Sequence, residues 1–163
     1  NKKTALLAIN LLKAKFDITE DNIRTGFKNV VLNTGLLGRW QVLQEKPFVV
    51  CDTAHNAHGL KIVLNQIKMH KFKKLHIVLG VVKDKDLASI LPLFPKKANY
   101  YFCKPNVSRG LDANVLHGKA AEFGLKGEVF ISVSTAYKKA LEQADENDFI
   151  YIGGSTFVVA EIV

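Results

Sequence analysis

The sequence predicts an α/β fold in which helices flank a mostly parallel sheet, preceded by a short helical segment. Short apolar runs rich in β-branched residues alternate with amphipathic segments of about ten residues, the pattern of βαβ units. The runs are continuously apolar, as expected for strands that are covered on both faces. Polar side chains follow four of these runs directly, and ligands bind beyond the carboxyl ends of the strands in such sheets.

The composition indicates a globular protein with a core of ordinary size. Of the 163 residues, 48% are hydrophobic and 23% are charged. The formal charge of +8 suits an anionic partner, which can be a nucleotide, a polyacid substrate or nucleic acid. No apolar run approaches the roughly 18 residues of a membrane span, and Lys2 and Lys3 precede an amphipathic segment rather than a secretory signal. Cys51 and Cys103 lie in strand-like runs, so we expect reduced, buried thiols in a cytoplasmic protein with no membrane partner.

The first 37 residues are expected to form a helical segment that is left from the end of a preceding domain, or a docking arm. Apolar residues recur at helical spacing over residues 4–16. Thr19 can cap a second helix over residues 20–30, which has two acidic residues in its first turn. A cluster of helix breakers at 33–38 then marks a boundary between residues 1–37 and a domain over 38–163.

The elements after this boundary alternate regularly and predict a Rossmann-like sheet. We expect strands at 40–43, 48–51, 75–82, 99–103, 128–131 and 149–152. We expect helices at 59–70, 87–94, 112–123, 134–144 and 156–163, four of them capped by Asn56, Asp112, Ser134 and Ser155. The last segment is also rich in β-branched residues and can be a strand, but its place after a strand and a Gly-Gly-Ser turn favours a helix.

The candidate site consists of the polar residues that follow the strands. They are Asp52, Thr53, His55 and Asn56, then Lys83, Asp84, Lys85 and Asp86, then Ser108 and Arg109, and finally Ser155. An aspartate there can accept hydrogen bonds from ribose hydroxyls, and lysine or arginine can hold phosphates or carboxylates. Taken one at a time, each residue is better explained as a helix cap or a solvated turn; their recurrence at four strand ends is what suggests a site.

Several familiar kinds of site are absent from the sequence. There is neither a G-x-x-x-x-G-K-[ST] phosphate loop nor a G-x-G-x-x-G fingerprint, so we expect no complete nucleotide chemistry. His55 and His58 lack the flanking pattern of a zinc site, and Ser155 lacks the elbow of a hydrolase nucleophile. The basic run Lys68–Lys74 can be a nucleic-acid patch, but a solvated helix end is favoured.

Five segments in order resemble the C-terminal domain of folylpolyglutamate synthase, an enzyme of the Mur ligase superfamily that is often bifunctional with dihydrofolate synthase. They are Gly38-Arg-Trp-Gln-Val42, Asp52-Thr-Ala-His-Asn56, Leu79-Gly-Val-Val-Lys-Asp-Lys-Asp86, Arg109-Gly-Leu-Asp112 and Gly154-Ser155. The resemblance runs from about Gly38 to the end of the chain. Ala57 and Thr53 depart from the family, which usually has proline and often glycine at these positions; both changes affect loop stiffness and not the contacting groups.

The resemblance implies an ATP-dependent amide ligase that adds L-glutamate to folates, to dihydropteroate or to both through an acyl phosphate. It places ATP contacts on Arg39 and Asp52 and contacts to the incoming glutamate on His55 and Ser155. The family's phosphate loop, magnesium ligands and modified lysine belong to an N-terminal P-loop ATPase domain outside this chain, and the resemblance implies that residues 1–37 are a helical segment left from the end of that domain. We therefore expect ATP and Mg²⁺ to serve the full-length enzyme, with no metal ligand and no catalytic residue in this chain, which would be inactive alone.

The expected partners are that N-terminal domain, folate or dihydropteroate, and L-glutamate, in a monomer that does not bind nucleic acid. Two other functions stay open. The chain can be the amino-acid-binding domain of another Mur-type ligase, acting in cell-wall synthesis. It can also be a non-catalytic basic module that binds nucleic acid or protein.

Overall fold

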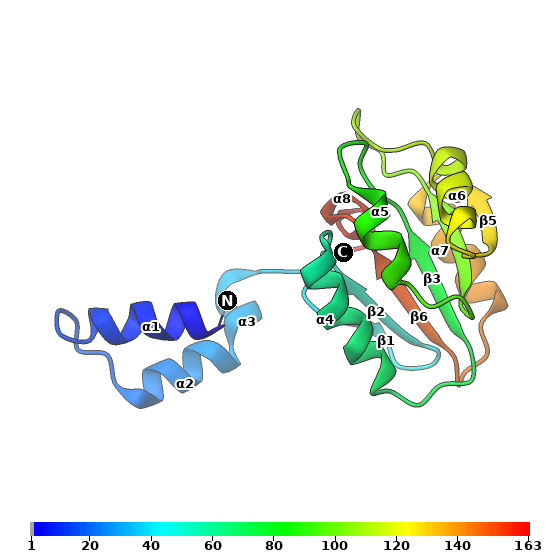
Figure 1. The fold of residues 1–163 in the computed structure, drawn as a ribbon. Coiled ribbons are helices and arrows are strands. Elements are labelled where there is room, and N and C mark those ends of the chain that lie inside the picture. The colour runs from blue at the N-terminus through cyan, green and yellow to red at the C-terminus, as the bar shows by residue number, and fades with distance from the viewer. Residues whose placement is uncertain (1) are drawn as a thin grey trace. The chain divides into compact units, whose positions relative to one another are not determined.

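The computed structural model describes residues 2–163 and divides into two compact units, one ending at Leu37 and the other running from Gly38 to Val163 (Figure 1). The first unit contains α1 (Lys2–Leu12), α2 (Glu20–Lys28) and α3 (Val30–Thr34). Thr19 caps α2 as predicted, since its hydroxyl oxygen accepts a hydrogen bond from the Asn22 amide (3.1 Å). The helix predicted over residues 20–30 is interrupted at Asn29. That this unit ends a preceding ATPase domain stays a prediction.

The second unit is built on a six-stranded sheet with the order β1-β2-β6-β3-β4-β5. The strands are β1 (Gln41–Gln44), β2 (Phe48–Asp52), β3 (Leu75–Leu79), β4 (Asn99–Cys103), β5 (Gly127–Phe130) and β6 (Phe149–Gly153). All neighbouring strands run parallel except β1, which is antiparallel to β2. The mostly parallel α/β architecture is thus confirmed.

Helices cover both faces of this sheet (Figure 1). They are α4 (Ala57–Lys68), α5 (Leu87–Ile90), η1 (Leu91–Leu93), α6 (Ala113–Glu122), α7 (Val133–Gln143) and α8 (Thr156–Ala160). Alternate strand residues belong to two apolar clusters: Val50 lies in a cluster that includes residues of α4 and α6, whereas Val49 and Cys51 lie in a cluster that includes residues of α7 and α8. This double burial explains why the strands read as continuous apolar runs. Within residues 2–163, no helix is long and apolar enough to cross a membrane.

Most predicted helix caps are confirmed, and one is wrong. Asn56, Asp112 and Ser155 each accept a backbone N–H at the start of their helix. Helix α7, however, begins before Ser134, because Ser132 and Thr135 form a reciprocal capping box. The final segment is a helix, as favoured, since Val158 and Val159 pack against the sheet. Cys51 and Cys103 are buried free thiols, as predicted.

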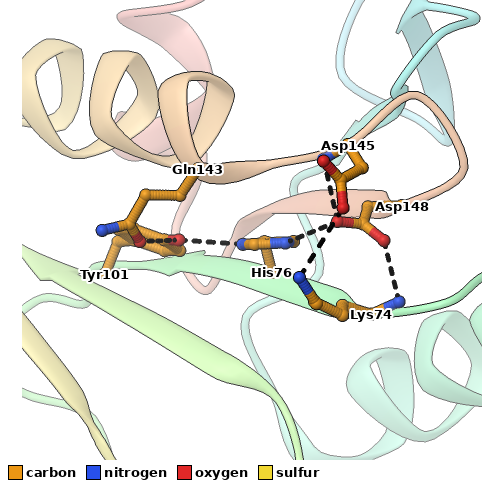
Figure 2. A network of polar contacts seen from close by, with 6 residues as sticks. All are labelled: Lys74, His76, Tyr101, Gln143, Asp145 and Asp148. Atoms are coloured by element: carbon orange, nitrogen blue, oxygen red, sulfur yellow. Dashed lines mark hydrogen bonds and ion pairs between the residues drawn. The ribbon is translucent and has the colours of Figure 1, made fainter.

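A buried polar chain joins β3, β4 and the start of β6 (Figure 2). His76 Nδ1 lies 2.8 Å from the Tyr101 hydroxyl, and His76 Nε2 lies 3.3 Å from Asp148 Oδ2. The Tyr101 hydroxyl also bonds the side-chain amide of Gln143 (2.7 Å). Asp148 accepts the backbone N–H groups of Lys74 (3.0 Å) and Asp145 (2.9 Å) as well. Both His76 and Asp148 are only 1% exposed, so this network fixes the amino ends of the strands.

Burial controls the protonation of this network. Desolvation lowers the pKa of His76, and this effect outweighs the opposing influence of Asp148. The neutral imidazole carries one N–H, which Nε2 donates to the Asp148 carboxylate, while the Tyr101 hydroxyl donates its single hydrogen to Gln143 Oε1. For Asp148, burial raises the pKa, but hydrogen bonds from the Asp145 amide, the His76 ring and the Lys74 amide together hold the pKa below its usual value.

We expect the free energy of unfolding to fall as the pH drops below about 6.5, the ordinary pKa of histidine. In that range the unfolded chain binds more protons at His76 than the folded chain does, because the folded pKa is lowered. Asp148 adds to acid sensitivity only below its own ordinary pKa of 3.8. In the variant His76→Gln, the free energy of unfolding should depend less on pH between roughly pH 5 and 6.5, as measured by urea unfolding.

The control is His58→Gln, at an exposed position on α4. Its free energy of unfolding should change with pH as steeply as that of the parent chain. Equal slopes in the parent chain and in His76→Gln would contradict this account of the network.

Candidate functional site

Gly38 and Trp40 hold Arg39 on a tight turn before β1. Gly38 adopts a left-handed φ of 70°, and a Cβ atom there would lie 2.7 Å from Val159 Cγ1 and 2.8 Å from Thr53 Cγ2. Only glycine fits both the conformation and the space. The Gly38 amide donates to Gln41 Oε1 (2.8 Å), and the Gly38 carbonyl accepts from the Thr53 amide (2.9 Å). The exposed Arg39 side chain therefore extends from a fixed backbone.

Asp52, the last residue of β2, binds this turn. Its Oδ2 atom accepts the Trp40 amide (2.7 Å), and its Oδ1 atom accepts the Ala54 amide (2.8 Å). Trp40 has a φ of 46°, a left-handed conformation that is rare for a bulky residue and needs support from its surroundings. The Trp40 ring packs against His70 and Phe149, with ring centroids 5.7 and 6.3 Å apart.

The structure thus brings the segments of Arg39 and Asp52 together at the carboxyl edge of the sheet, where the sequence analysis expects them. Asp52 is more enclosed than expected, with an exposed fraction of 8%, and both carboxylate oxygens accept main-chain N–H groups. Among residues 2–163, Arg39 forms no ion pair with Asp52. Asp52 clearly positions the turn, and its contact with a nucleotide stays a prediction.

His55 and Ser155 line one pocket at the same edge, with a volume of about 320 Å³. His55 Nδ1 lies 3.0 Å from the Thr53 carbonyl oxygen. A carbonyl only accepts, so Nδ1 carries the hydrogen, and a neutral His55 keeps a free lone pair on Nε2. Ser155 is 3% exposed and its Oγ atom accepts the Phe157 amide (3.2 Å), which leaves its hydroxyl hydrogen free to donate.

Gly154 sets the position of Ser155. It has a φ of 93°, and a Cβ atom there would lie 2.6 Å from Leu79 Cδ1 and 2.7 Å from the Gly80 carbonyl oxygen. This close approach of the β6 end to the β3 end requires glycine. Close backbone packing therefore accounts for the glycine of the Gly154-Ser155 pair, whatever the serine binds.

The pocket also carries charges of both signs, from Asp84, Lys85 and Arg109. The Arg109 guanidinium lies over the Phe157 ring at 4.9 Å, and its Nη1 atom lies 3.9 Å from Asp84 Oδ2. Sequence reasoning had placed these three residues at strand ends without giving them individual roles. It did not find Phe157, whose apolar side chain after a Gly-Gly-Ser turn suggests only core packing.

Other polar residues at the strand ends serve the loops. Lys83 Nζ donates to the Ser108 carbonyl (3.3 Å), and Asp86 caps α5 by accepting the Ser89 amide (3.2 Å). Asn56 caps α4 through the Gly59 amide (2.8 Å). The interpretation as caps and turns therefore holds for these positions. In the part of the chain that the structure describes, no three His, Cys, Asp or Glu residues are grouped so that they could hold a metal ion.

Residues 38–156 match the family of the Mur ligase glutamate ligase domain. The chain belongs to this family. Its resemblance to folylpolyglutamate synthase is confirmed: the dihydrofolate synthase/folylpolyglutamate synthase of Escherichia coli K12 is 30% identical over 165 residues, which cover 100% of this chain and 37% of that protein.

Solved structures show the same fold as this Mur ligase domain. Escherichia coli FolC in complex with DHPP and ADP is 28% identical, with a TM-score of 0.83 over 99% of this chain and 37% of that chain. A bifunctional folylpolyglutamate synthase/dihydrofolate synthase with Mn, AMPPNP and L-glutamate bound is 30% identical, with a TM-score of 0.74 over 89% of this chain and 34% of that chain. The domain thus spans little more than a third of the length of these relatives.

Proposed function

We propose that this Mur ligase domain forms the carboxyl-terminal part of an ATP-dependent ligase that adds L-glutamate to folates, to dihydropteroate or to both. The names of the relatives support the substrate class, and one similar structure holds L-glutamate. The observation that carries the proposal is the mixed-charge pocket, which places two cations, one carboxylate, an imidazole and a hydroxyl around one space.

The pocket matches the charges of glutamate. At neutral pH free glutamate carries two carboxylates and one ammonium group. Arg109 and Lys85 suit the carboxylates, arginine by a bidentate contact, and Asp84 suits the ammonium. The Arg109 guanidinium lies over the Phe157 ring, a cation–π contact that favours this position of the side chain.

His55 and Ser155 complete the proposed amino-acid site. The incoming amine must lose a proton before its nitrogen attacks an acyl phosphate, forming a C–N bond while the C–O bond to phosphate breaks. The free Nε2 lone pair of His55 is a suitable acceptor for that proton, a role that departs from the expectation that this chain supplies no catalytic residue. The Ser155 hydroxyl can donate to a glutamate carboxylate, because its oxygen already accepts the Phe157 amide.

Arg39 and Asp52 are proposed to serve the nucleotide. ATP, when bound, supplies the phosphoryl group that makes a carboxylate oxygen a good leaving group. Arg39, exposed on its fixed turn, suits phosphate oxygens. Asp52 holds that turn and keeps unused lone pairs that can accept a ribose hydroxyl. The resemblance to folylpolyglutamate synthase assigns the magnesium ligands to the N-terminal P-loop domain.

We expect the chain to work only together with its own N-terminal domain, in a cytoplasmic monomer. The sequence contains no phosphate loop, so the 163-residue chain should neither hydrolyse ATP nor ligate glutamate by itself.

The substrate class is tested by assaying the full-length enzyme with tetrahydrofolate, dihydropteroate and UDP-linked muropeptides, each with ATP and L-glutamate. We expect ADP release to depend on a folate or on dihydropteroate. Turnover with muropeptides alone would assign the chain to a cell-wall ligase and overturn the proposal.

Replacing the nucleotide residues should impair the use of ATP. In the full-length enzyme, Arg39→Ala and Asp52→Ala should each lower kcat/KM for ATP by roughly tenfold to a hundredfold. The first variant loses a charge-assisted contact with phosphate, and the second loses the hydrogen bonds that hold the turn carrying Arg39. Steady-state kinetics with varied ATP measure the effect, and urea unfolding reports any loss of stability in Asp52→Ala. Arg24→Ala, an exposed arginine on α2, is the control. Unchanged ATP kinetics in both variants would refute the nucleotide assignment.

Replacing the pocket residues should instead impair the use of glutamate. Arg109→Ala should raise KM for L-glutamate by about tenfold, because a bidentate carboxylate contact is lost, while KM for ATP stays near the parent value. His55→Gln should mainly lower kcat, because the acceptor for the proton of the incoming amine is lost. Lys83→Ala is the matched control, since Lys83 bonds a loop carbonyl nearby. A similar loss in Lys83→Ala would show that loop structure, and not contact with glutamate, is responsible.

A further inference from the structure

A second pocket lies at the opposite, amino edge of the sheet and has no place in the proposed ligase reaction. It lies between the end of α4 and the segments that lead into β3 and β4, and its volume is about 310 Å³. Because the strands are parallel, this edge is the one farthest from the loops that carry His55 and Ser155 (Figure 1). The pocket is formed entirely within the second unit.

The wall of this pocket is apolar and its polar groups are cationic. The apolar side chains are Leu64, Ile67, Phe72, Leu75, Pro95 and Ala98. The other lining residues are Lys68, Lys73, Lys74, Lys97 and Asn99, with no acidic residue among them. We call this site the lysine pocket. A mostly apolar cavity with a few convergent polar groups is the usual form of a small-molecule site.

Within the described residues 2–163, three of these lysines have no carboxylate partner. Lys74 Nζ lies 3.7 Å from Asp145 Oδ2 (Figure 2), so its charge is partly balanced. None of the ion pairs formed among residues 2–163 involves Lys68, Lys73 or Lys97. Like charges gathered around one cavity repel one another, and a bound anion would relieve that repulsion.

A neighbouring pocket shows that this charge pattern is local. It has a volume of about 580 Å³ and shares Phe72 and Lys73 with the lysine pocket. Its lining includes the acidic residues Glu45, Glu146 and Asp148 beside its lysines, whereas the lining of the lysine pocket contains no acidic residue. The unbalanced positive charge therefore belongs to the lysine pocket and not to the whole amino edge.

We propose that the lysine pocket binds a small amphipathic anion, with an apolar or aromatic body that carries a carboxylate or phosphate group. The body would pack against Phe72 and the aliphatic residues, and the anionic group would lie among the ammonium groups of Lys68, Lys73 and Lys97. A compact cavity suits one such body, whereas an extended nucleic-acid strand needs a continuous basic groove with several stacking platforms. The proposal is independent of the ligase reaction at the other edge.

The test is a calorimetric titration of the 163-residue chain with three probes. 2-Naphthoate combines an apolar body with an anion, 2-naphthamide has the same body without charge, and inorganic sulfate has the charge without the body. We expect measurable binding of 2-naphthoate only, and weaker binding at higher salt because the lysines are exposed. An oligothymidylate titration under the same conditions tests the nucleic-acid alternative.

Variants locate the binding. The double variant Lys68→Gln/Lys97→Gln should weaken 2-naphthoate binding roughly tenfold, because two charged donors are lost. Lys138→Gln/Lys139→Gln on α7, which covers the other face of the sheet, makes the same change in net charge and should bind as the parent does. Thermal unfolding of both variants confirms that each is folded at the titration temperature.

Four results would overturn the proposal. They are the absence of 2-naphthoate binding at millimolar concentration, equal binding of 2-naphthamide or sulfate, equal losses in the two double variants, and tighter binding of oligothymidylate that the lysine-pocket variant abolishes.

Discussion

The carboxylate of Asp52 is the contact on which the candidate nucleotide edge depends. A buried carboxylate is tolerated only when its oxygens are hydrogen-bonded, and here the Trp40 and Ala54 amides supply those bonds. One end of this link is the last residue of β2, and the other is a turn with an unfavourable backbone conformation. The link fixes where Arg39 begins, so the structural role of Asp52 is also what gives Arg39 a defined position for binding.

The two edges of the sheet are held in different ways. At the amino edge, the His76–Asp148 network ties the strands by buried side-chain hydrogen bonds. At the carboxyl edge, close packing at Gly38 and Gly154 fixes the segments that lead to Arg39 and Ser155. A rigid sheet carrying variable loops is the usual way in which such folds position ligands. Residues for chemistry can therefore gather at one edge without weakening the core.

The fold was largely predictable because local signals agree with the tertiary structure. All six strands and most helix caps follow from apolar runs and short polar residues. The error at α7 arose because both Ser132 and Ser134 can cap, and only the position of Thr135 decides between them. The antiparallel pairing of β1 with β2 was not predicted either. The site was predictable only as a sheet edge: the enclosure of Asp52 and the stacking of Arg109 on Phe157 depend on contacts between segments distant in sequence.

The distribution of charge separates the two proposed sites. Each of the five residues of β3 advances the chain by about 3.3 Å, so the lysines before this strand lie roughly 16 Å or more from the loops that follow it. The Debye length at physiological salt is about 8 Å, and exposed charges at that distance are largely screened from the carboxyl edge. Lys68, Lys73 and Lys97 therefore contribute little to binding ATP or glutamate. The clustering of these lysines around an apolar cavity therefore needs a local explanation, and an anion bound in the lysine pocket provides one.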